Sequence, residues 1–332
     1  MEPLQSNPFR LHLTRPDGNA THQVMAPQLV GCLWSGDKVV ARGSLWWDGL
    51  ERVRFDTWLN AETRAAKAFL QVGRLGELEA TETKAAVAFL HQACDILCQW
   101  GCTLVLGPMD GSTWQSYRCA LNWNHGPPFF SEPQTDPRWV DWFTQAGFTP
   151  VAQYESRLCL DLSQTHPPGR RWHSPASVRI QSAQGIAVEA LLPQIYALVM
   201  ASFRRQPFFQ PLPEDGFASY LRPLLTQVDS ALIQLAWDED RLVGVVLALP
   251  DLLATDSQRL IIKTLAIWPD RAYAGLGSTL LEAAHQAGFD QGYRQAIHAL
   301  MHSHNLSLNL SRRYSQPFRD YVLMGKKLSP TQ

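Results

Sequence analysis

The sharpest chemical signal in the chain lies in residues 260–284, where an apolar stretch runs into a proline, two glycines and a second apolar stretch. The glycines, Gly275 and Gly277, let backbone N–H groups approach a ligand closely. The helix expected to begin here adds unpaired N–H donors and partial positive charge at its first turn. Together these features predict a pyrophosphate cradle, to which Ser278 or Thr279 could add a hydroxyl.

Neither of two common nucleotide-binding loops fits this stretch. A dinucleotide-binding loop needs a third glycine in G-x-G-x-x-G, whereas Thr279-Leu280 stand where that glycine should come. A P-loop needs Gly-Lys followed by Ser or Thr, which is absent here. The simpler alternative is a tight turn opened by glycine, with no ligand.

The same stretch resembles the acyl-CoA-binding segment of the GNAT superfamily, in which a strand and a proline lead to Gln/Arg-x-x-Gly-x-Gly/Ala at the start of a helix. The six positions here run Ala272-Tyr273-Ala274-Gly275-Leu276-Gly277. Both glycines match, but Ala272 replaces the usual Gln or Arg, with Arg271 one residue earlier. The resemblance implies acetyl-CoA or another acyl-CoA as donor substrate, bound by these six residues and Ser278.

Further contacts are implied by the resemblance alone. The strand before the glycine turn is expected to pair with the pantetheine arm through Leu265, Ala266 and Ile267. Asn305, after the next strand, occupies the place of an Asn that commonly contacts the cofactor. The tyrosine that often protonates the leaving thiolate is replaced by Arg312, so Tyr314 and Tyr321 are the nearest candidates for that role.

A histidine-rich strand follows the predicted cradle. Acylation of an amine needs a base or a water chain to take the amine proton. The stretch "HALMHSHN" supplies His298, His302 and His304, and the first two share one face of a strand. A histidine titrates near neutral pH, so we take His302 as a catalytic candidate. The alternative is that these histidines are structural or solvated.

The elements that position these residues occur twice along the chain. Residues 163–175 are polar and rich in proline, and predict a linker. A hairpin, a strand, a helix and a further strand are expected in the same order on both sides of it. We therefore expect an α/β (α+β) protein of two tandem GNAT-like domains, 1–162 and 176–332. Each should have a mixed, mostly antiparallel central sheet flanked by helices.

The first domain lacks the cradle. Glu79 and Glu82 stand where the glycine pair should be, and carboxylates repel a pyrophosphate. A degenerate, scaffold-like domain is expected there. The resemblance, which covers residues 29–328, extends to bacterial GNAT-like proteins with a Gly-Pro-Met element in the N-terminal half, here Gly107-Pro108-Met109.

A long irregular loop over residues 107–138 is expected to form one wall of the acceptor site between the two domains. Its aromatic residues are Trp114, Tyr117, Trp123, Phe129 and Phe130. The proline-broken stretch 206–213 would face it from the second domain. Ligand pockets favour domain interfaces, although the loop could instead seal the core of its own domain.

Composition limits the class of protein. The 332 residues are 45% hydrophobic and 18% charged with a net charge of −1, which predicts packed cores and no nucleic-acid or membrane partner. No signal peptide or membrane-spanning stretch is recognised, so a cytoplasmic protein is expected. The spacing of Cys94, Cys98 and Cys102 follows a helix face and lacks a close pair, so no metal site is predicted.

These features favour an acyl-CoA-dependent N-acyltransferase that transfers an acyl group, in the first place acetyl, to the primary amine of a small molecule or peptide. Two alternatives remain. One is a catalytically inactive module that binds acyl-CoA. The other is a Fem-type aminoacyl transferase, which is also a tandem GNAT-like protein but has no need of the glycine cradle.

Overall fold

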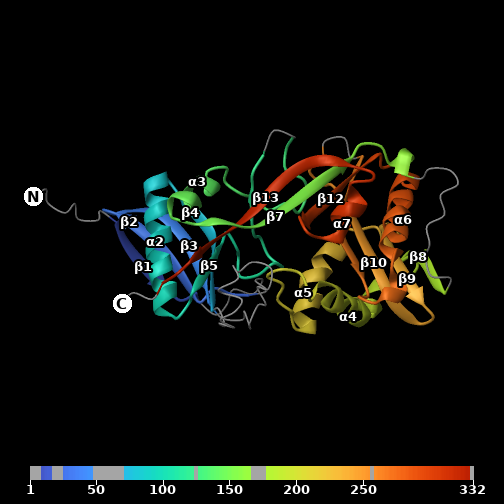
Figure 1. Cartoon of the computed structure of the whole chain (residues 1–332), viewed down its shortest axis with the longest axis horizontal. Helices are drawn as coiled ribbons and strands as arrows, with labels where there is room; N and C mark the ends of the chain where they lie inside the picture. The colour runs from blue at the N-terminus through green and yellow to red at the C-terminus, as the bar shows by residue number, and fades with distance from the viewer. Residues whose placement is uncertain are drawn as a thin grey trace, which may run out of the picture.

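The computed structural model describes residues 9–16, 25–47, 71–122, 126–165, 177–254 and 258–329. Its strands join into one 13-stranded sheet. The molecule is elongated, with one half of the chain at each end and two long strands running between the ends (Figure 1). None of the described helices is long and apolar enough to cross a bilayer.

The first half follows the order predicted from its apolar pattern. Its elements are β1 (Phe9–Thr14), β2 (Leu29–Ser35), β3 (Lys38–Trp46), β4 (Val72–Ala80), α2 (Thr83–Gln99) and β5 (Leu104–Gly107). The predicted hairpin of β2 and β3 turns at Gly36, and α2 is followed by Gly101; both glycines have a positive φ. Strand β1 was not predicted; Phe9, Leu11 and Leu13 alternate with polar residues in it, but most of its residues are exposed.

The second half repeats this plan and adds helices. Its elements are β8 (Val178–Ser182), α4 (Leu192–Phe203), α5 (Glu214–Leu225), β9 (Ile233–Asp238), β10 (Arg241–Pro250), β11 (Arg259–Ile267), α6 (Leu276–Asp290), β12 (Gln295–His302) and α7 (Leu306–Ser311). Helix α4 begins at Leu192, after a 3-10 turn over residues 188–191. Pro193 explains this start, because proline is tolerated in the first turn of an α-helix.

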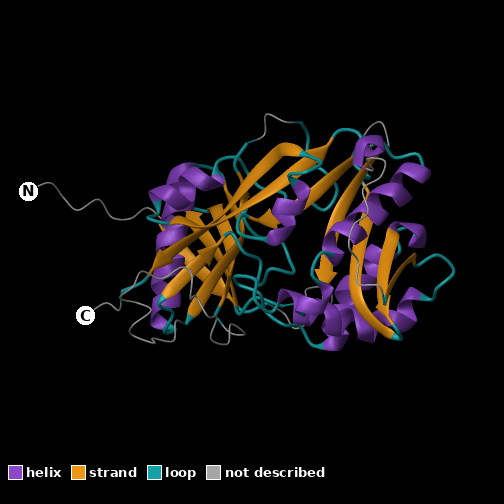
Figure 2. Ribbon diagram, turned by 45° about the vertical axis from the view of Figure 1, so that its right-hand side comes forward, coloured by secondary structure: helices purple, strands orange, loops and turns teal. Residues whose placement is uncertain are grey.

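Helices cover both faces of the sheet in the second half (Figure 2). In β10, Val245 and Leu247 pack in the core that includes α4 and α5, whereas Val246 and Ala248 pack in the core that includes α6. A strand buried on both faces is apolar throughout rather than at every second residue. This explains the unbroken apolar run of β10.

The last strand of each half lies in the other half's part of the sheet. These strands are β7 (Thr149–Cys159), which follows α3 (Trp139–Gln145), and β13 (Gln316–Lys327). Strand β7 pairs with β12, β13 pairs with β5 and with β6 (Cys119–Ala120), and the two long strands pair with each other. They lie side by side across the middle of Figure 1. This exchange was not predicted, and the domain borders stay a prediction because residues 166–176 lie outside the described residues.

A buried polar cluster fastens the exchanged strands to the loop between β6 and α3. Arg319 forms an ion pair with Glu132 at 2.7 Å, and both side chains are fully buried. The Arg319 guanidinium also donates to the backbone oxygens of Asn122 (2.8 Å) and Gly126 (2.9 Å). The Tyr321 hydroxyl bonds to Glu132 and lies 3.1 Å from the Ser156 hydroxyl on β7. The cluster therefore joins β13, β7 and the loop.

Replacing Arg319 with methionine should destabilise the whole protein. The change leaves the Glu132 carboxylate buried without its cation, which costs about 3–5 kcal/mol of unfolding free energy. Urea unfolding followed by circular dichroism measures this, with the exposed Arg179→Met on edge strand β8 as control. A loss of less than about 1 kcal/mol would be typical of a surface pair and would contradict the role of the cluster.

Candidate functional site

The candidate site begins where β11 and β12 part. The two strands pair in parallel from Arg259 and Gln295 as far as Ile262 and His298, and no pairing follows. A bulge in β11 leaves Lys263 without a partner in β10, since Leu247 faces Thr264 and Ala248 faces Ile262. A cavity of about 260 Å³ opens at this point, lined by both strands, by α4 and α5, and by the loop after β5.

The glycine turn at the start of α6 has the geometry of a cradle. Gly275 is the N-cap residue and has φ 89°, a left-handed conformation that favours glycine. Helix α6 begins at Leu276, so the N–H groups of its first turn, including that of Gly277, have no carbonyl partner within the helix. The motif thus supplies free donors and the positive end of a helix dipole at one place.

Other positions of the six-residue motif serve the turn itself. The Ala272 N–H donates to the Asp270 carboxylate (2.9 Å), and the Ala274 N–H donates to the Arg271 oxygen (3.1 Å). The buried Tyr273 side chain donates its hydroxyl to Asp238 (2.9 Å), and Leu276 is fully buried. The Ser278 N–H donates to the Gly275 oxygen (3.0 Å), so the backbone N–H groups left for acyl-CoA lie near Gly275 and Gly277. The contacts of all these residues with acyl-CoA stay a prediction.

The strand edge expected to hold the pantetheine arm is open on one side. Leu265, Ala266 and Ile267 pair with β10 on one edge, whereas the edge toward β12 has no strand partner. Leu265 lines the cavity, and the Ile267 N–H donates to the Ser202 hydroxyl (3.3 Å). An open edge of this kind can accept an extended chain that carries amide groups.

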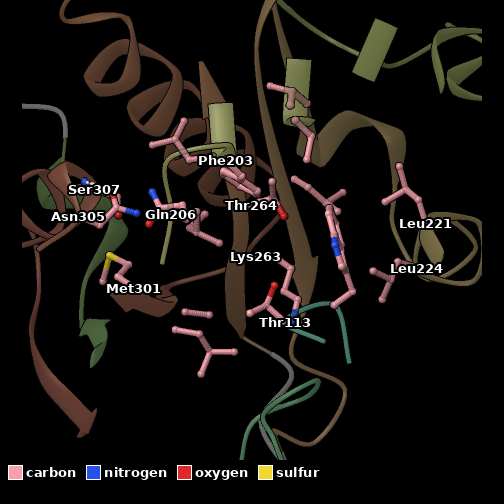
Figure 3. Close-up of a pocket in the computed structure, with 18 of the residues that line it drawn as sticks. Thr113, Phe203, Gln206, Leu221, Leu224, Lys263, Thr264, Met301, Asn305 and Ser307 are labelled. Carbon is pink, nitrogen blue, oxygen red and sulfur yellow. Dashed lines mark hydrogen bonds between the residues drawn. The ribbon is translucent and has the colours of Figure 1, made fainter. Parts of the chain in front are cut away.

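Asn305 lies at the end of the cavity nearest Ser307 and Gln206 (Figure 3). Its side-chain oxygen accepts the Ser307 N–H at 3.2 Å and so caps α7. This bond fixes the side-chain oxygen and leaves the amide NH₂ as a donor. The cap gives Asn305 a structural role in addition to the predicted cofactor contact.

His302 lines the cavity and is uncharged near neutral pH. Burial, His304 and Arg118 lower the pKa of His302 to about 4. Its Nδ1 accepts the His304 N–H at 3.1 Å, so the neutral ring carries its proton on Nε2. Nε2 is buried and has no hydrogen-bond partner among the described residues. The ring is therefore arranged as a hydrogen-bond donor rather than as the base expected from sequence.

The other candidate acid–base residues lie away from this cavity or are engaged elsewhere. Tyr321 lines neither of the two main cavities and belongs to the buried cluster on β13. Tyr314 donates its hydroxyl to Glu282 at 2.6 Å. His298 lines the cavity, but burial lowers its pKa to about 3 and its ring bonds to His285 and Ser311. Only His302 of the predicted catalytic residues faces the cavity.

The loop after β5 lines the cavity from the first half, and its predicted role as a wall of the acceptor site stays a prediction. Trp114 and Tyr117 line it, and the Trp114 indole N–H donates to the Gln210 oxygen at 2.7 Å. This bond joins the loop to the proline-broken stretch 206–213. Phe129 and Phe130 pack instead in the core of the second half, and Trp123 lies outside the described residues.

A second cavity of about 690 Å³ adjoins the first. The two share several lining residues, which are Thr113, Trp114, Tyr117, Arg118, Tyr220, Leu224, Lys263 and Leu300. Residues of β4 and the following loops, such as Glu77 and Asp110, line its far side. Both cavities thus include a residue from each of the parted strands, Lys263 of β11 and Leu300 of β12.

Arg118 and Lys263 are the residues that sequence reasoning missed. Both line both cavities. In the sequence, Lys263 is only one member of the apolar strand "LIIKTLAI", and a lone lysine in such a strand was the available signal. Arg118 sits in an irregular loop, where no periodicity shows which way a side chain points.

The first half has no comparable cradle among its described residues. Glu82 is the N-cap residue of α2, the place that Gly275 takes in α6. Glu79 lies at the end of β4 and forms an exposed ion pair with Arg42 at 2.7 Å. Glu82 therefore stands at the start of this helix, where its carboxylate opposes an anion, whereas Glu79 lies in the strand before it and is paired.

The charge state of His302 is directly measurable. Because its native pKa is lowered from 6.5 to about 4, the ring should stay neutral, with its proton on Nε2, from pH 8 to pH 5. The unfolded chain takes up this proton below pH 6.5, so the stability that the neutral ring contributes is lost as the pH falls from 6.5 toward 4. Imidazole ¹⁵N shifts report the state, and a charged His302 at pH 6 would refute this assignment.

Part of the chain, including the elements around the cavity, matches a known protein family. Residues 192–310 match the model of the Acetyltransferase (GNAT) family. This range includes α4, α5, the glycine turn and both parted strands, but it is less than half of the chain. No curated protein gives a significant match.

Solved structures resemble the chain over nearly its whole length. A tandem GNAT protein from the clavulanic acid biosynthesis pathway is 14% identical, with a TM-score of 0.51 over 93% of this chain and 86% of that one. The glucosamine N-acetyltransferase region of a fungal multi-domain β-N-acetylglucosaminidase is 10% identical, with a TM-score of 0.50 over 90% and 33%. A GCN5-related N-acetyltransferase from Sphaerobacter thermophilus is 15% identical, with a TM-score of 0.48 over 91% and 82%. Such identities concern the fold alone. The chain therefore has the predicted GNAT-like α/β fold, and its residues 192–310 match the GNAT acetyltransferase family.

Proposed function

We propose that the protein is an acyl-CoA-dependent N-acyltransferase whose donor binds in the second half and whose acceptor binds between the halves. The observation that carries the proposal is the coincidence of three features at one place: the parted strands, the glycine-opened helix α6 and a cavity between them. The family match over residues 192–310 supports acyl transfer in general. The donor and the acceptor are our own inference.

The donor side is argued from unpaired backbone groups. A pyrophosphate is an anion, and the N–H groups at Gly275 and Gly277 together with the helix dipole favour one there. A pantetheine arm carries amides that can bond to the open edge of β11 at Leu265–Ile267. The thioester would then lie where the strands part, beside Lys263 and His302.

Negative charge develops on the thioester oxygen and then on the leaving sulfur during acyl transfer, and the site must stabilise it. The amine nitrogen attacks the thioester carbon, the C–N bond forms and the C–S bond breaks. The proton that the amine loses ends on the departing thiolate, which leaves as the CoA thiol. We assign to His302 a hydrogen bond from its Nε2–H to the reacting oxygen or sulfur, with the proton staying on the ring, since this donor lacks another partner among the described residues. A preorganised donor in a site that excludes water stabilises such charge strongly.

Measurement of CoA release tests the proposal. Acetyl-CoA binding is first measured by calorimetry, and thiol release is then followed with a panel of primary amines. Binding with release that depends on an amine supports the proposal. Binding without turnover on any amine indicates the inactive module, and no acyl-CoA binding at all rejects the proposal. Aminoacyl-tRNA consumption in place of acyl-CoA would indicate the Fem-type alternative.

Gly275→Glu should abolish CoA binding while the protein stays folded. The new side chain strains a left-handed residue and places a carboxylate at the cradle. Gly292→Glu is the matched control, because Gly292 also has a positive φ (94°) and lies beyond the other end of α6, where an added Cβ atom would meet nothing within 4 Å. Calorimetry should detect CoA binding to the control only. Equal affinities for CoA would show that the cradle is misplaced.

His302→Phe should lower kcat and leave CoA affinity unchanged. The ring contact with Tyr154 can persist, but the Nε2–H donor is lost. Loss of one such donor lowers kcat by roughly a hundredfold or more. The exposed His304→Phe serves as control for a histidine-to-phenylalanine change in the same segment. A His302→Phe enzyme with the kcat of the wild type would remove this residue from the mechanism.

A further inference from the structure

Two cations, Arg118 and Lys263, line both cavities beside the proposed reaction centre without a counter-ion among the described residues. Arg118 is only 4% exposed, and Lys263 is half-buried. Neither forms an ion pair with any residue in the described part of the chain. Arg157, Arg259 and Arg319, which are also sheltered, each pair with a carboxylate. Sheltered charges are normally paired, so the Arg118–Lys263 pair is an exception that needs an explanation.

Arg118 is held rigidly from the loop side. Its guanidinium lies over the rings of Tyr117 and Tyr154, at 3.8 and 4.1 Å from their centroids. Its Nε donates to the backbone oxygen of Tyr117 (3.3 Å), and its Nη1 donates to the backbone oxygen of Leu300 (3.2 Å). The remaining nitrogen, Nη2, donates to no described residue. The guanidinium is thus fixed in orientation with donor capacity to spare, which suits a two-oxygen anion.

Lys263 approaches the same place from the strand side. It occupies the bulge of β11, at the first position beyond the paired part of the strands. Its ammonium group donates to no residue within the described ranges. Burial, and then the charge of Arg118, lower the pKa of Lys263 to about 8. The lysine is therefore still mainly charged at pH 7, and a bound anion between the two groups would favour the charged form further.

The carboxylates that line the second cavity do not form ion pairs with Arg118 or Lys263. Glu132 pairs with Arg319. The Asp110 carboxylate accepts the Glu77 N–H at 2.8 Å, and the Glu77 carboxylate accepts the Ser44 hydroxyl. These acids bond to other groups, and none forms an ion pair with Arg118 or Lys263 in the described part of the chain, which leaves the counter-charge open to a ligand.

We propose that Arg118 and Lys263 form a carboxylate-binding subsite at the junction of the two cavities. The inference rests on the proposed function and narrows its substrates: either the acceptor amine or the transferred acyl chain carries a carboxylate. The first source corresponds to an amino acid or a peptide terminus, and the second to a dicarboxylic acyl group. Either one would place its anion beside the parted strands.

Two pairs of matched ligands separate the sources by calorimetry. The donor arm compares succinyl-CoA with butyryl-CoA. The acceptor arm compares phenylalanine with phenylalaninamide on protein saturated with CoA. The variants are Lys263→Met, Arg118→Gln and, as a matched control, the exposed Lys327→Met at the end of β13. Thermal unfolding of each variant establishes that it is folded.

The wild type and the Lys327→Met control should bind the carboxylate member of one pair roughly tenfold or more tightly than the matched ligand that lacks the carboxylate. Lys263→Met and Arg118→Gln should each lose most of that preference while CoA binds as before. Preference in the donor arm identifies an acidic acyl chain, and preference in the acceptor arm identifies an acidic acceptor. No preference in either arm, or a preference that Lys263→Met retains, overturns the subsite. Loss of CoA binding by the wild type would instead overturn the proposed function.

Discussion

The parting of β11 from β12 after Ile262 and His298 is the constraint on which the site depends. Backbone N–H and C=O groups inside a protein need partners, and the unpaired edge of β11 has none from the neighbouring strand. The bulge at Lys263 marks the point where the two strands diverge. A cavity opens at this point, and the glycine turn before α6 follows the end of the same strand. In our proposal, an extended donor substrate supplies the missing partners.

The exchange of final strands turns two halves into one frame around that cavity. Because β7 extends the second half and β13 extends the first, neither half can move away without breaking the central pairing of these strands. The Arg319–Glu132 pair adds a buried bond between β13 and the loop that precedes α3. The loop between β5 and β6, which carries Trp114 and Arg118, is held against the second half by the hydrogen bond from the Trp114 indole N–H to the Gln210 backbone oxygen. Rigid walls of this kind hold a substrate in one orientation, which is a main source of catalytic rate.

The electrostatic character of the cavity follows from which groups are paired. Burial keeps His302 neutral, and its Nδ1 is occupied by the His304 N–H, which leaves a proton donor at Nε2. Burial and Arg118 also lower the pKa of Lys263 to about 8, yet the lysine remains mostly charged at pH 7. Positive charge in a sheltered cavity attracts anions more strongly than the same charge on an exposed surface, because less water screens it. The site thus favours anionic groups on its substrates and negative charge that develops during transfer.

Local patterns were enough to predict much of the molecule. The apolar spacing in α2 and the glycine that follows it set that helix and its end, and the helix start at Gly275 was predictable because a left-handed turn favours glycine. The two-part α/β fold followed from the repeated order of elements. The exchange of β7 and β13 could not be predicted, since partner choice between similar apolar strands depends on contacts far apart in sequence. The same reason hid Arg118 and Lys263: they meet only because a loop from the first half folds over a bulge in the second, and burial, not residue type, then decides which charges stay unpaired.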